Sequence, residues 1–428
     1  MESTRYLIVG AGVTGLAMAN FLRSDQYLVL ERDEAIGGYC KTIKQDGFVW
    51  DYSGHFFHFR QPEIERMLVE RMPPGEVSTV RRCSQVYHRG KRIDFPFQKN
   101  IHQLEKEEFI DCLYDLWRAT AASGENPSSF KEMLLQRFGR SIAEKFLIPY
   151  NEKLYACDVQ TLDVDAMGRF FPYAKLADII KNMREPDNAS YNASFTYPRG
   201  GAIEYVKALE QGVRPGAIRL GEALQGVDLE RKLATTNKGT ISFEYLISSA
   251  PFDRFLTMTA LEQNEAAVAA RRRRYQYNKV MVFNLGFDRK GWSEPHWVYF
   301  ADPALSYYRV GFYDNIFASD RMSLYVEIGA GRDADLETEQ MRQRVLADLR
   351  RVGIIDEHQL VSWHSVVMDP AYVHVTREAK EELEQLRRVL ALRGVFSIGR
   401  YGGWTYCSIE DNIIEARALA ELFNQLEG

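Results

Sequence analysis

Residues 5–38, RYLIVGAGVTGLAMANFLRSDQYLVLERDEAIGG, decide the fold of this chain. The stretch opens with an apolar run at 7–9, passes through a glycine-rich turn into small and apolar residues at helical spacing, and ends in a second apolar run at 27–30. Gly10, Gly12 and Gly15 give the turn the spacing GxGxxG. The order of strand, turn, helix and strand therefore predicts a βαβ unit that binds a nucleotide.

The acidic residue Glu31 follows the second run, where a carboxylate can accept hydrogen bonds from a ribose. In such a turn the first glycine permits the tight bend, the second lets the backbone approach a pyrophosphate, and the third lets the helix lie close to the sheet. The free N–H groups of the helix N-terminus then face the diphosphate.

A second glycine pair, Gly37 and Gly38, comes about six residues after the acid. This spacing resembles the flavoproteins with two dinucleotide-binding domains, in which the pair approaches the adenosine diphosphate part of FAD. The pair therefore favours FAD over NAD as the cofactor.

Composition limits the remaining possibilities. A chain of 428 residues with 46% hydrophobic content can form two or three domains. Its net charge of −5 gives no reason to expect nucleic acid, and no apolar run is long enough to span a bilayer. The five cysteines are widely spread without a CxxC pair, which favours reduced thiols over disulfides or a metal site, and no secretory signal precedes the turn. We expect a cytoplasmic protein.

The pattern along the chain predicts an α/β fold with three parts. Residues 1–60, 196–255 and 393–428 form a Rossmann-like FAD-binding domain, 61–195 a mainly helical inserted domain, and 256–392 an antiparallel β-sheet substrate domain. The last part contains the successive runs VMVFNLGF, HWVYF, YYRVGFY and SLYVEIG. In the C-terminal segment, Gly399 and Arg400 precede a glycine pair and a long apolar helix, which indicates a second contact with FAD near Asp411.

Five segments together resemble the UDP-galactopyranose mutase family, in particular its eukaryotic-type branch. They are Ser53-Gly54-His55; Phe95 to Ile101; Pro149 to Ala156 followed by Met167-Gly168-Arg169; Asn192 to Gly201; and Trp297 to Arg309 with Gly399 to Asp411. Their common order along one chain is more specific than GxGxxG alone.

The resemblance implies a set of site residues. Arg169 and Arg309 would bind the diphosphate of a nucleotide sugar, for which the bidentate guanidinium is suited, and His55 would lie beside the flavin. The implied substrate contacts are Phe95, Phe97, Gln98, Asn151, Tyr155, Asn192, Tyr299, Tyr372 and Tyr406. The family has glycine at the position of Ser53 and tyrosine at the position of Phe95, so the identity of the nucleotide and of the sugar stays open.

The implied activity is the interconversion of pyranose and furanose forms of a UDP-sugar in carbohydrate biosynthesis. Reduced FAD would attack the anomeric carbon through N5, with NAD(P)H as a possible external reductant. Two alternatives remain open: a flavin oxidoreductase of the amine oxidase or protoporphyrinogen oxidase type, and a noncatalytic flavin-binding protein. The oligomeric state stays undetermined.

Overall fold

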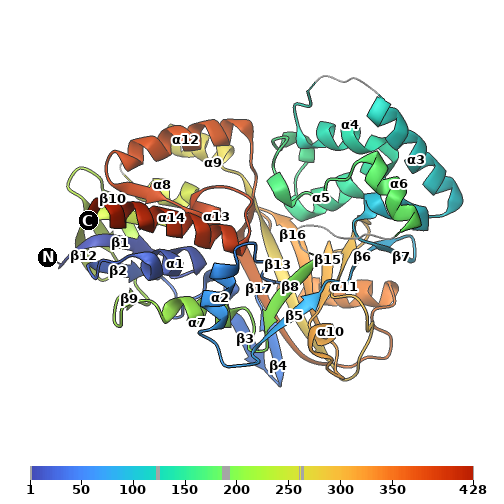
Figure 1. Ribbon diagram of the computed structural model, residues 1–428, viewed down its shortest axis with the longest axis horizontal. Helices are drawn as coiled ribbons and strands as arrows, with labels where there is room; N and C mark the ends of the chain where they lie inside the picture. The colour runs from blue at the N-terminus through green and yellow to red at the C-terminus, as the bar shows by residue number, and fades with distance from the viewer. Residues whose placement is uncertain (1, 122–125, 186–192, 260, 262–264, 428) are drawn as a thin grey trace.

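Two large sheets organise the computed structural model, which describes residues 2–121, 126–185, 193–259, 261 and 265–427 (Figure 1). The first sheet has the strand order β10-β11-β12-β1-β2-β9, with β18 also paired to β12. Its strands are β1 (Glu2–Val9), β2 (Tyr27–Leu30), β9 (Ile218–Arg219), β10 (Leu224–Asp228), β11 (Leu233–Thr236), β12 (Gly239–Ser248) and β18 (Val395–Ser397). The pairs β12-β1, β1-β2, β2-β9 and β12-β18 are parallel, as a Rossmann-like domain requires.

Segments from both ends of the chain meet on this first sheet. Helix α1 (Val13–Phe21) lies beside helix α14 (Ile409–Glu427), and both termini lie at the left of Figure 1. The Tyr6 ring on β1 packs 5.1 Å from the ring of Phe423 on α14. The C-terminal helix α14 therefore packs against the βαβ unit from the other end of the chain.

The second sheet has the order β17-β13-β16-β15-β14-β6-β7. Its strands are β6 (Ser84–His88), β7 (Lys91–Asp94), β13 (Tyr277–Phe287), β14 (Trp297–Phe300), β15 (Arg309–Phe312), β16 (Ser323–Gly331) and β17 (Leu360–Val373). All neighbours are antiparallel except β14 and β6. The antiparallel sheet matches the expectation, but β6 and β7 join it from the segment that precedes the helices.

The helical part lies at the upper right of Figure 1. It contains α3 (Lys106–Ala121), α4 (Phe130–Ile142), α5 (Ile148–Tyr155) and α6 (Leu176–Arg184). These helices turn Leu116, Leu134, Leu154 and Ile179 into the core. Helix α4 bends at Gly139, where the backbone adopts a φ of 75° that favours glycine. A Cβ at this position would also clash with the backbone of Asp115.

The chain has further helices and two small ribbons. The helices are α2 (Pro62–Val69), α7 (Ile203–Glu210), α8 (Phe252–Met258), α9 (Glu265–Arg274), α10 (Asp314–Phe317), α11 (Thr338–Arg351), α12 (Arg377–Ala391) and α13 (Gly399–Gly402). Two small ribbons pair β3 (Thr42–Gln45) with β4 (Phe48–Asp51) and β5 (Val77–Arg81) with β8 (Ser194–Pro198).

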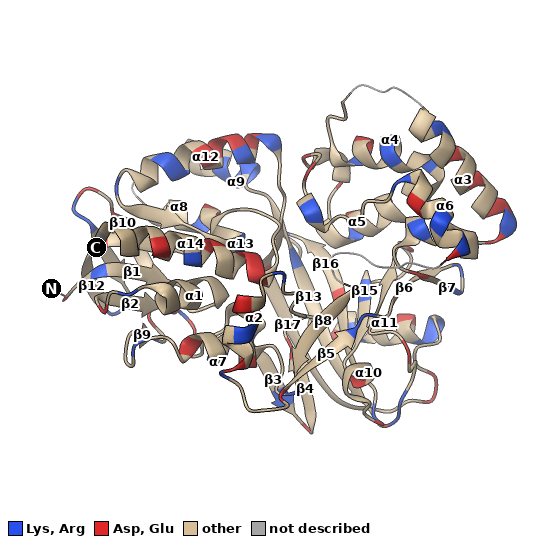
Figure 2. Cartoon of the chain, in the orientation of Figure 1, with Lys and Arg blue, Asp and Glu red and all other residues tan. Residues whose placement is uncertain are grey.

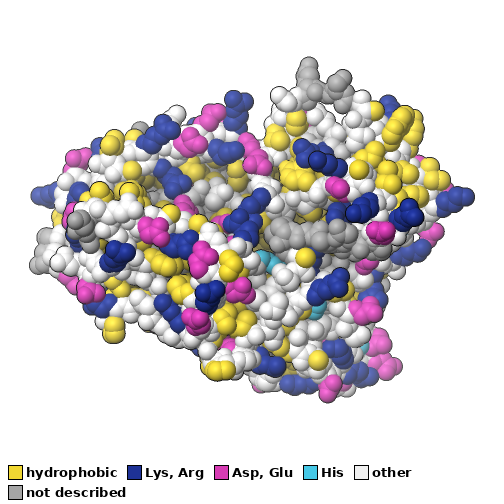
Figure 3. Space-filling model, viewed as in Figure 1, with side chains coloured by type: hydrophobic (Ala, Val, Ile, Leu, Met, Phe, Trp, Pro, Cys, Tyr) yellow, Lys and Arg dark blue, Asp and Glu magenta, His cyan; other side chains and the backbone are white. Residues whose placement is uncertain are grey.

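Charged residues concentrate on the outer helices, α12 among them, whereas the long central strands carry few of them (Figure 2). On the face drawn in Figure 3, basic and acidic side chains are interspersed, and a notch separates the α12 side of the molecule from the helical part. Among the described helices, none combines the length and the apolar composition needed to cross a bilayer.

Candidate active site

A cavity of about 540 Å³ lies where the two sheets and the helical part meet. Its wall includes the glycine turn after β1, the segment after β4, the end of α5, strands β14 to β16, the end of β17 and the start of α14. One continuous cavity therefore joins the expected cofactor region to the expected substrate region.

The glycines at one end of the cavity form a cradle for a dinucleotide. A Cβ on Gly15 would lie 1.9 Å from the carbonyl oxygen of Gly10, so only glycine allows α1 to pack this closely on β1. A Cβ on Gly12 would lie 3.9 Å from the Cα and 4.0 Å from the backbone N of Gly38, and Gly37 donates its N–H to the carbonyl of Ala11 (2.9 Å). The two glycine turns thus face each other, and no side chain in the described part of the chain caps the N-terminus of α1.

The Glu31 carboxylate is fixed at the edge of this cradle. It accepts hydrogen bonds from the backbone N–H of Ala11 (2.8 Å) and of Asp33 (3.0 Å), and the residue lines the cavity. It follows β2, the position from which the sequence predicts a ribose contact. The bare helix N-terminus, the paired glycine turns and this carboxylate fit the diphosphate and ribose of FAD.

His55 faces the cavity from the segment that follows β4. Burial lowers the pKa of its imidazole to about 4, so the ring is neutral at physiological pH. Its Nδ1 is buried and has no hydrogen-bond partner among the described residues. The neighbouring Gly54 is constrained, because a Cβ there would lie 2.4 Å from the hydroxyl of Tyr325 on β16.

Arg309 projects from β15 into the cavity and is held by Glu327 on β16. Its Nε and Nη2 donate to the two carboxylate oxygens at 2.6 and 2.7 Å, and the hydroxyl of Ser53 donates to the same carboxylate. Burial opposes ionisation of Glu327, but the Arg309 guanidinium outweighs it and lowers the pKa of the carboxyl. The result is a rigid, buried ion pair next to the His55 segment.

Tyrosines surround the Arg309 side of the cavity. Tyr299 and Tyr372 line it, as expected, and Tyr406 stacks on Tyr372 with ring centroids 5.9 Å apart. Tyr150, from α5, packs edge-on against Tyr299 at 5.3 Å. These phenolic groups give one wall of the cavity many hydroxyls beside apolar ring faces.

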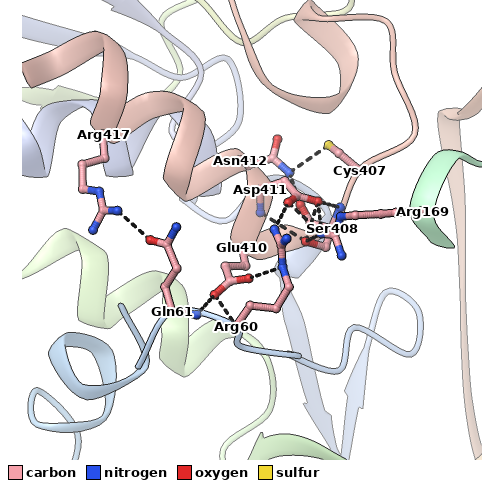
Figure 4. Close-up of polar contacts among 9 residues, drawn as sticks. All are labelled: Arg60, Gln61, Arg169, Cys407, Ser408, Glu410, Asp411, Asn412 and Arg417. Atoms are coloured by element: carbon pink, nitrogen blue, oxygen red, sulfur yellow. Dashed lines mark hydrogen bonds and ion pairs between the residues drawn. The ribbon is translucent and has the colours of Figure 1, made fainter. Parts of the chain in front are cut away.

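Arg169 lies elsewhere, in a polar network between the helical part and the start of α14 (Figure 4). Its Nη2 lies 2.7 Å from each carboxylate oxygen of Asp411, and its guanidinium stacks 4.1 Å from the Phe170 ring. Asp411 also accepts from Arg60 (2.6 Å), whose backbone N–H and Nε contact Glu410. Arg169 and Asp411 are absent from the cavity wall, although Met167 and Phe170 are part of it.

The remaining expected substrate residues divide into three groups. Phe95, Gln98 and Asn151 line the cavity, and the side-chain oxygens of Gln98 and Asn151 are buried without a hydrogen-bond partner among the described residues. Phe97 and Tyr155 are fully buried outside the wall: Phe97 packs on Phe146, and Tyr155 packs on Tyr372. Asn192 lies outside the described residues.

The second expected FAD contact lies next to the start of α1. A Cβ on Gly399 would lie 2.5 Å from the hydroxyl of Thr14, and the backbone N–H of Arg400 donates to Asn412 Oδ1 (2.8 Å). The Arg400 side chain lines the cavity, whereas Gly399 does not. This arrangement joins β18, α1 and α14.

Sequence reasoning missed Glu327. The available signal was a single charged residue inside the otherwise apolar strand SLYVEIGAG, because a carboxylate rarely occupies a buried strand without a partner. Tyr150 was part of a quoted motif but was not singled out. Tyr150 lies one helical turn before Leu154 on α5, and this spacing does not predict its contact with Tyr299 on β14.

Comparison with known proteins identifies the family. Residues 13–422 match the flavin containing amine oxidoreductases. The chain belongs to this family. Its cofactor is accordingly FAD, as the cradle predicts. Protoporphyrinogen oxidase 2 of Arabidopsis thaliana is 36% identical over 187 residues, which cover 40% of this chain and 36% of that protein. The chain spans less than half the length of the curated protoporphyrinogen oxidases that it matches.

Solved structures confirm the fold. The chain resembles reduced UDP-galactopyranose mutase with a TM-score of 0.91 and 23% identity, over 99% of this chain and 96% of the other. It resembles a provisionally assigned protoporphyrinogen oxidase from Exiguobacterium sp. 255-15 with a TM-score of 0.79 and 18% identity, over the full length of both chains. At these identities the similarity describes the architecture alone.

Proposed function

We propose that this flavoenzyme interconverts the pyranose and furanose forms of a nucleotide diphosphate sugar, and that this substrate is a UDP-sugar. The observation that carries the proposal is the fixed guanidinium of Arg309 within a wall of tyrosines, in the same cavity as the FAD cradle. Such a site suits a ligand with a dianionic diphosphate and a hydroxyl-rich ring. The similarity to reduced UDP-galactopyranose mutase supports this choice of ligand.

The cofactor end of the cavity would hold FAD through backbone groups. Gly10, Gly12 and the Gly37-Gly38 pair would contact the diphosphate, and Glu31 would bind the ribose. Reduced FAD would supply the electron pair that the anomeric carbon accepts. The neutral imidazole of His55, with its unpartnered Nδ1 in the wall, would present a polar atom near the flavin without adding a charge.

The other end would bind the nucleotide. The unpartnered oxygens of Gln98 and Asn151 can accept hydrogen bonds from a base, and Phe95 supplies an aromatic face. Arg309 would neutralise the diphosphate as it departs from the anomeric carbon, and Tyr299, Tyr372 and Tyr406 would donate hydrogen bonds to it. Arg169 would contribute only after it leaves Asp411.

A second candidate is a flavin oxidoreductase that acts on a porphyrinogen or an amine. The family membership and the 36% identity to a protoporphyrinogen oxidase favour it. Such an enzyme would consume an electron acceptor in proportion to its product, whereas a mutase returns the flavin to its starting redox state in each cycle.

The deciding experiment incubates the FAD-loaded enzyme, dithionite-reduced or oxidised, with UDP-galactofuranose and follows UDP-galactopyranose by chromatography. We expect turnover only with the reduced enzyme and without stoichiometric loss of reductant. Oxygen uptake that matches product formation from a porphyrinogen or amine, together with no sugar conversion in either redox state, would replace the mutase by the oxidoreductase.

A further inference from the structure

The arginines that line the cavity differ in how their charges are balanced. Arg32 Nε lies 3.6 Å from Asp33 Oδ1, and Arg254 Nη2 lies 2.5 Å from Asp369 Oδ1. Arg309 is paired with Glu327. Arg400 also lines the cavity, yet no carboxylate among the described residues forms an ion pair with it. It is thus the cavity arginine whose charge the described protein leaves uncompensated.

The hydrogen bonds of Arg400 are similarly incomplete. Its Nη1 donates to the carbonyl oxygen of Cys407 (3.1 Å), while its Nε is buried and has no acceptor among the described residues. A guanidinium carries five N–H donors, and buried donors are normally satisfied. A guanidinium in a cavity wall whose donors the described protein satisfies only in part suits an anionic ligand with several acceptor oxygens.

The surroundings of Arg400 indicate which part of the ligand it meets. Its guanidinium carbon lies 5.1 Å from the ring centroid of Tyr372 and 4.9 Å from that of Tyr406. These rings belong to the tyrosine wall that also includes Tyr299 and faces Arg309. The Phe170 ring, from the helical part, lies 5.4 Å from Tyr406. The guanidinium therefore points to the substrate side of the cavity, although its backbone is tied to Asn412 on the cofactor side.

We propose that Arg400 binds a phosphate oxygen of the ligand's diphosphate and forms, together with Arg309, the pair of arginines that receives this group. The expectation from sequence gave this role to Arg169 and placed Arg400 at FAD. In the structure Arg169 is neutralised by Asp411 outside the cavity wall, whereas Arg400 lies in the wall with open donors. The inference rests on the proposed function for the identity of the ligand.

The test compares phosphate-bearing and phosphate-free probes on the FAD-loaded protein. Uridine, UDP and inorganic pyrophosphate are titrated while flavin fluorescence and absorbance are recorded, and the FAD content of each variant is measured. The variants are Arg400→Gln, Arg400→Lys and the matched control Arg254→Gln, which removes a cavity arginine that Asp369 already balances.

We expect Arg400→Gln to weaken UDP and pyrophosphate binding by about ten- to a hundredfold, with uridine affinity and FAD content kept. Arg400→Lys should restore part of the loss, because the charge returns without the fork. Arg254→Gln should leave the preference for UDP over uridine within about twofold of wild type, since that charge is already paired.

Two results would overturn the proposal. The first is an Arg400→Gln protein that prefers UDP over uridine as strongly as wild type. The second is loss of FAD, or a shifted flavin potential, in both Arg400 variants with an unchanged preference for UDP, which would assign the residue to the cofactor. If Arg400→Gln does not fold, the ratio of UDP affinity to uridine affinity in Arg400→Lys decides instead. The protein could also bind pyrophosphate in a way that depends on Arg400 and yet fail to convert UDP-galactofuranose. That result would refute the proposed mutase activity but support the anion site at Arg400.

Discussion

The buried pair of Arg309 and Glu327 yields the sharpest prediction about stability. Glu327 is fully buried, and its two oxygens receive the Nε and Nη2 groups of Arg309 at 2.6 and 2.7 Å. Arg309→Gln leaves the carboxylate in the protein interior without its counterion, although the Ser53 hydroxyl still donates to it. Removal of one partner of a buried pair typically costs about 3–5 kcal/mol, so we expect a loss of this size in the free energy of unfolding at neutral pH.

The loss of stability in Arg309→Gln should change with pH in a definite direction. In the wild type the pKa of Glu327 is lowered, because the attraction of Arg309 exceeds the penalty of burial, so its stabilising contribution is present at neutral pH and is lost as the pH falls through the folded pKa. Without Arg309, burial dominates and raises that pKa. The deficit of Arg309→Gln should therefore be greatest near pH 8 and shrink towards pH 5, where the carboxyl becomes protonated.

The assay is urea unfolding of the FAD-saturated proteins between about pH 5 and pH 8. The set comprises the two single variants, Arg309→Gln and Glu327→Gln, and the double variant. We expect the double variant to be destabilised by less than the sum of the singles, with a coupling energy of about 1–3 kcal/mol. The exposed pair Arg140 and Glu144 on the helical part is the matched control and should couple by less than about 0.5 kcal/mol. A pH-independent deficit or a coupling no larger than that of the control would refute the argument.

Further predictions concern the cofactor and the cavity edge. Gly15→Ala should lower both FAD content and thermal stability, as measured by flavin absorbance per protein and by melting, because the new Cβ would lie 1.9 Å from the carbonyl of Gly10. Asp411→Asn should speed FAD release in stopped-flow fluorescence, since it weakens the contact between Arg169 and α14. The rate of the reduced enzyme should show no histidine titration near pH 6.5 from His55, whose pKa is about 4, while stability falls as the pH drops from about 6.5 towards 4.

The dinucleotide-binding unit could be predicted because its signals are local. Strand β2 begins and ends where the apolar run 27–30 placed it, and Glu31 reaches the turn before α1 as the spacing required. Helical and strand periodicity likewise indicated the helical part and the antiparallel sheet. Each of these features depends on periodicity within one helix or strand or on spacing within one βαβ unit, so a single sequence contains the information.

The partners of the charged residues could not be predicted in this way. Arg169 and Asp411 are 242 positions apart, and Ser53 reaches Glu327 across 274 positions. The choice of partner depends on how the helical part and the second sheet pack on the first sheet, which no local pattern records. The resemblance directed attention to Arg309, which lines the cavity, but it could not show that a buried glutamate holds its guanidinium.

Arg309 and Arg169, to which the sequence assigned the same role, differ in the carboxylates that balance their charges. Arg309 retains donors beyond its two contacts with Glu327, so it can contact a ligand while the pair keeps it rigid. Arg169 already satisfies Asp411, and if it moved to a ligand, Arg60 would continue to neutralise that carboxylate. Its release is therefore less costly than removal of Arg309, which would leave Glu327 unpaired. A functional test of Arg309 is consequently better made with lysine than with alanine, because lysine keeps the charge that the buried carboxylate requires.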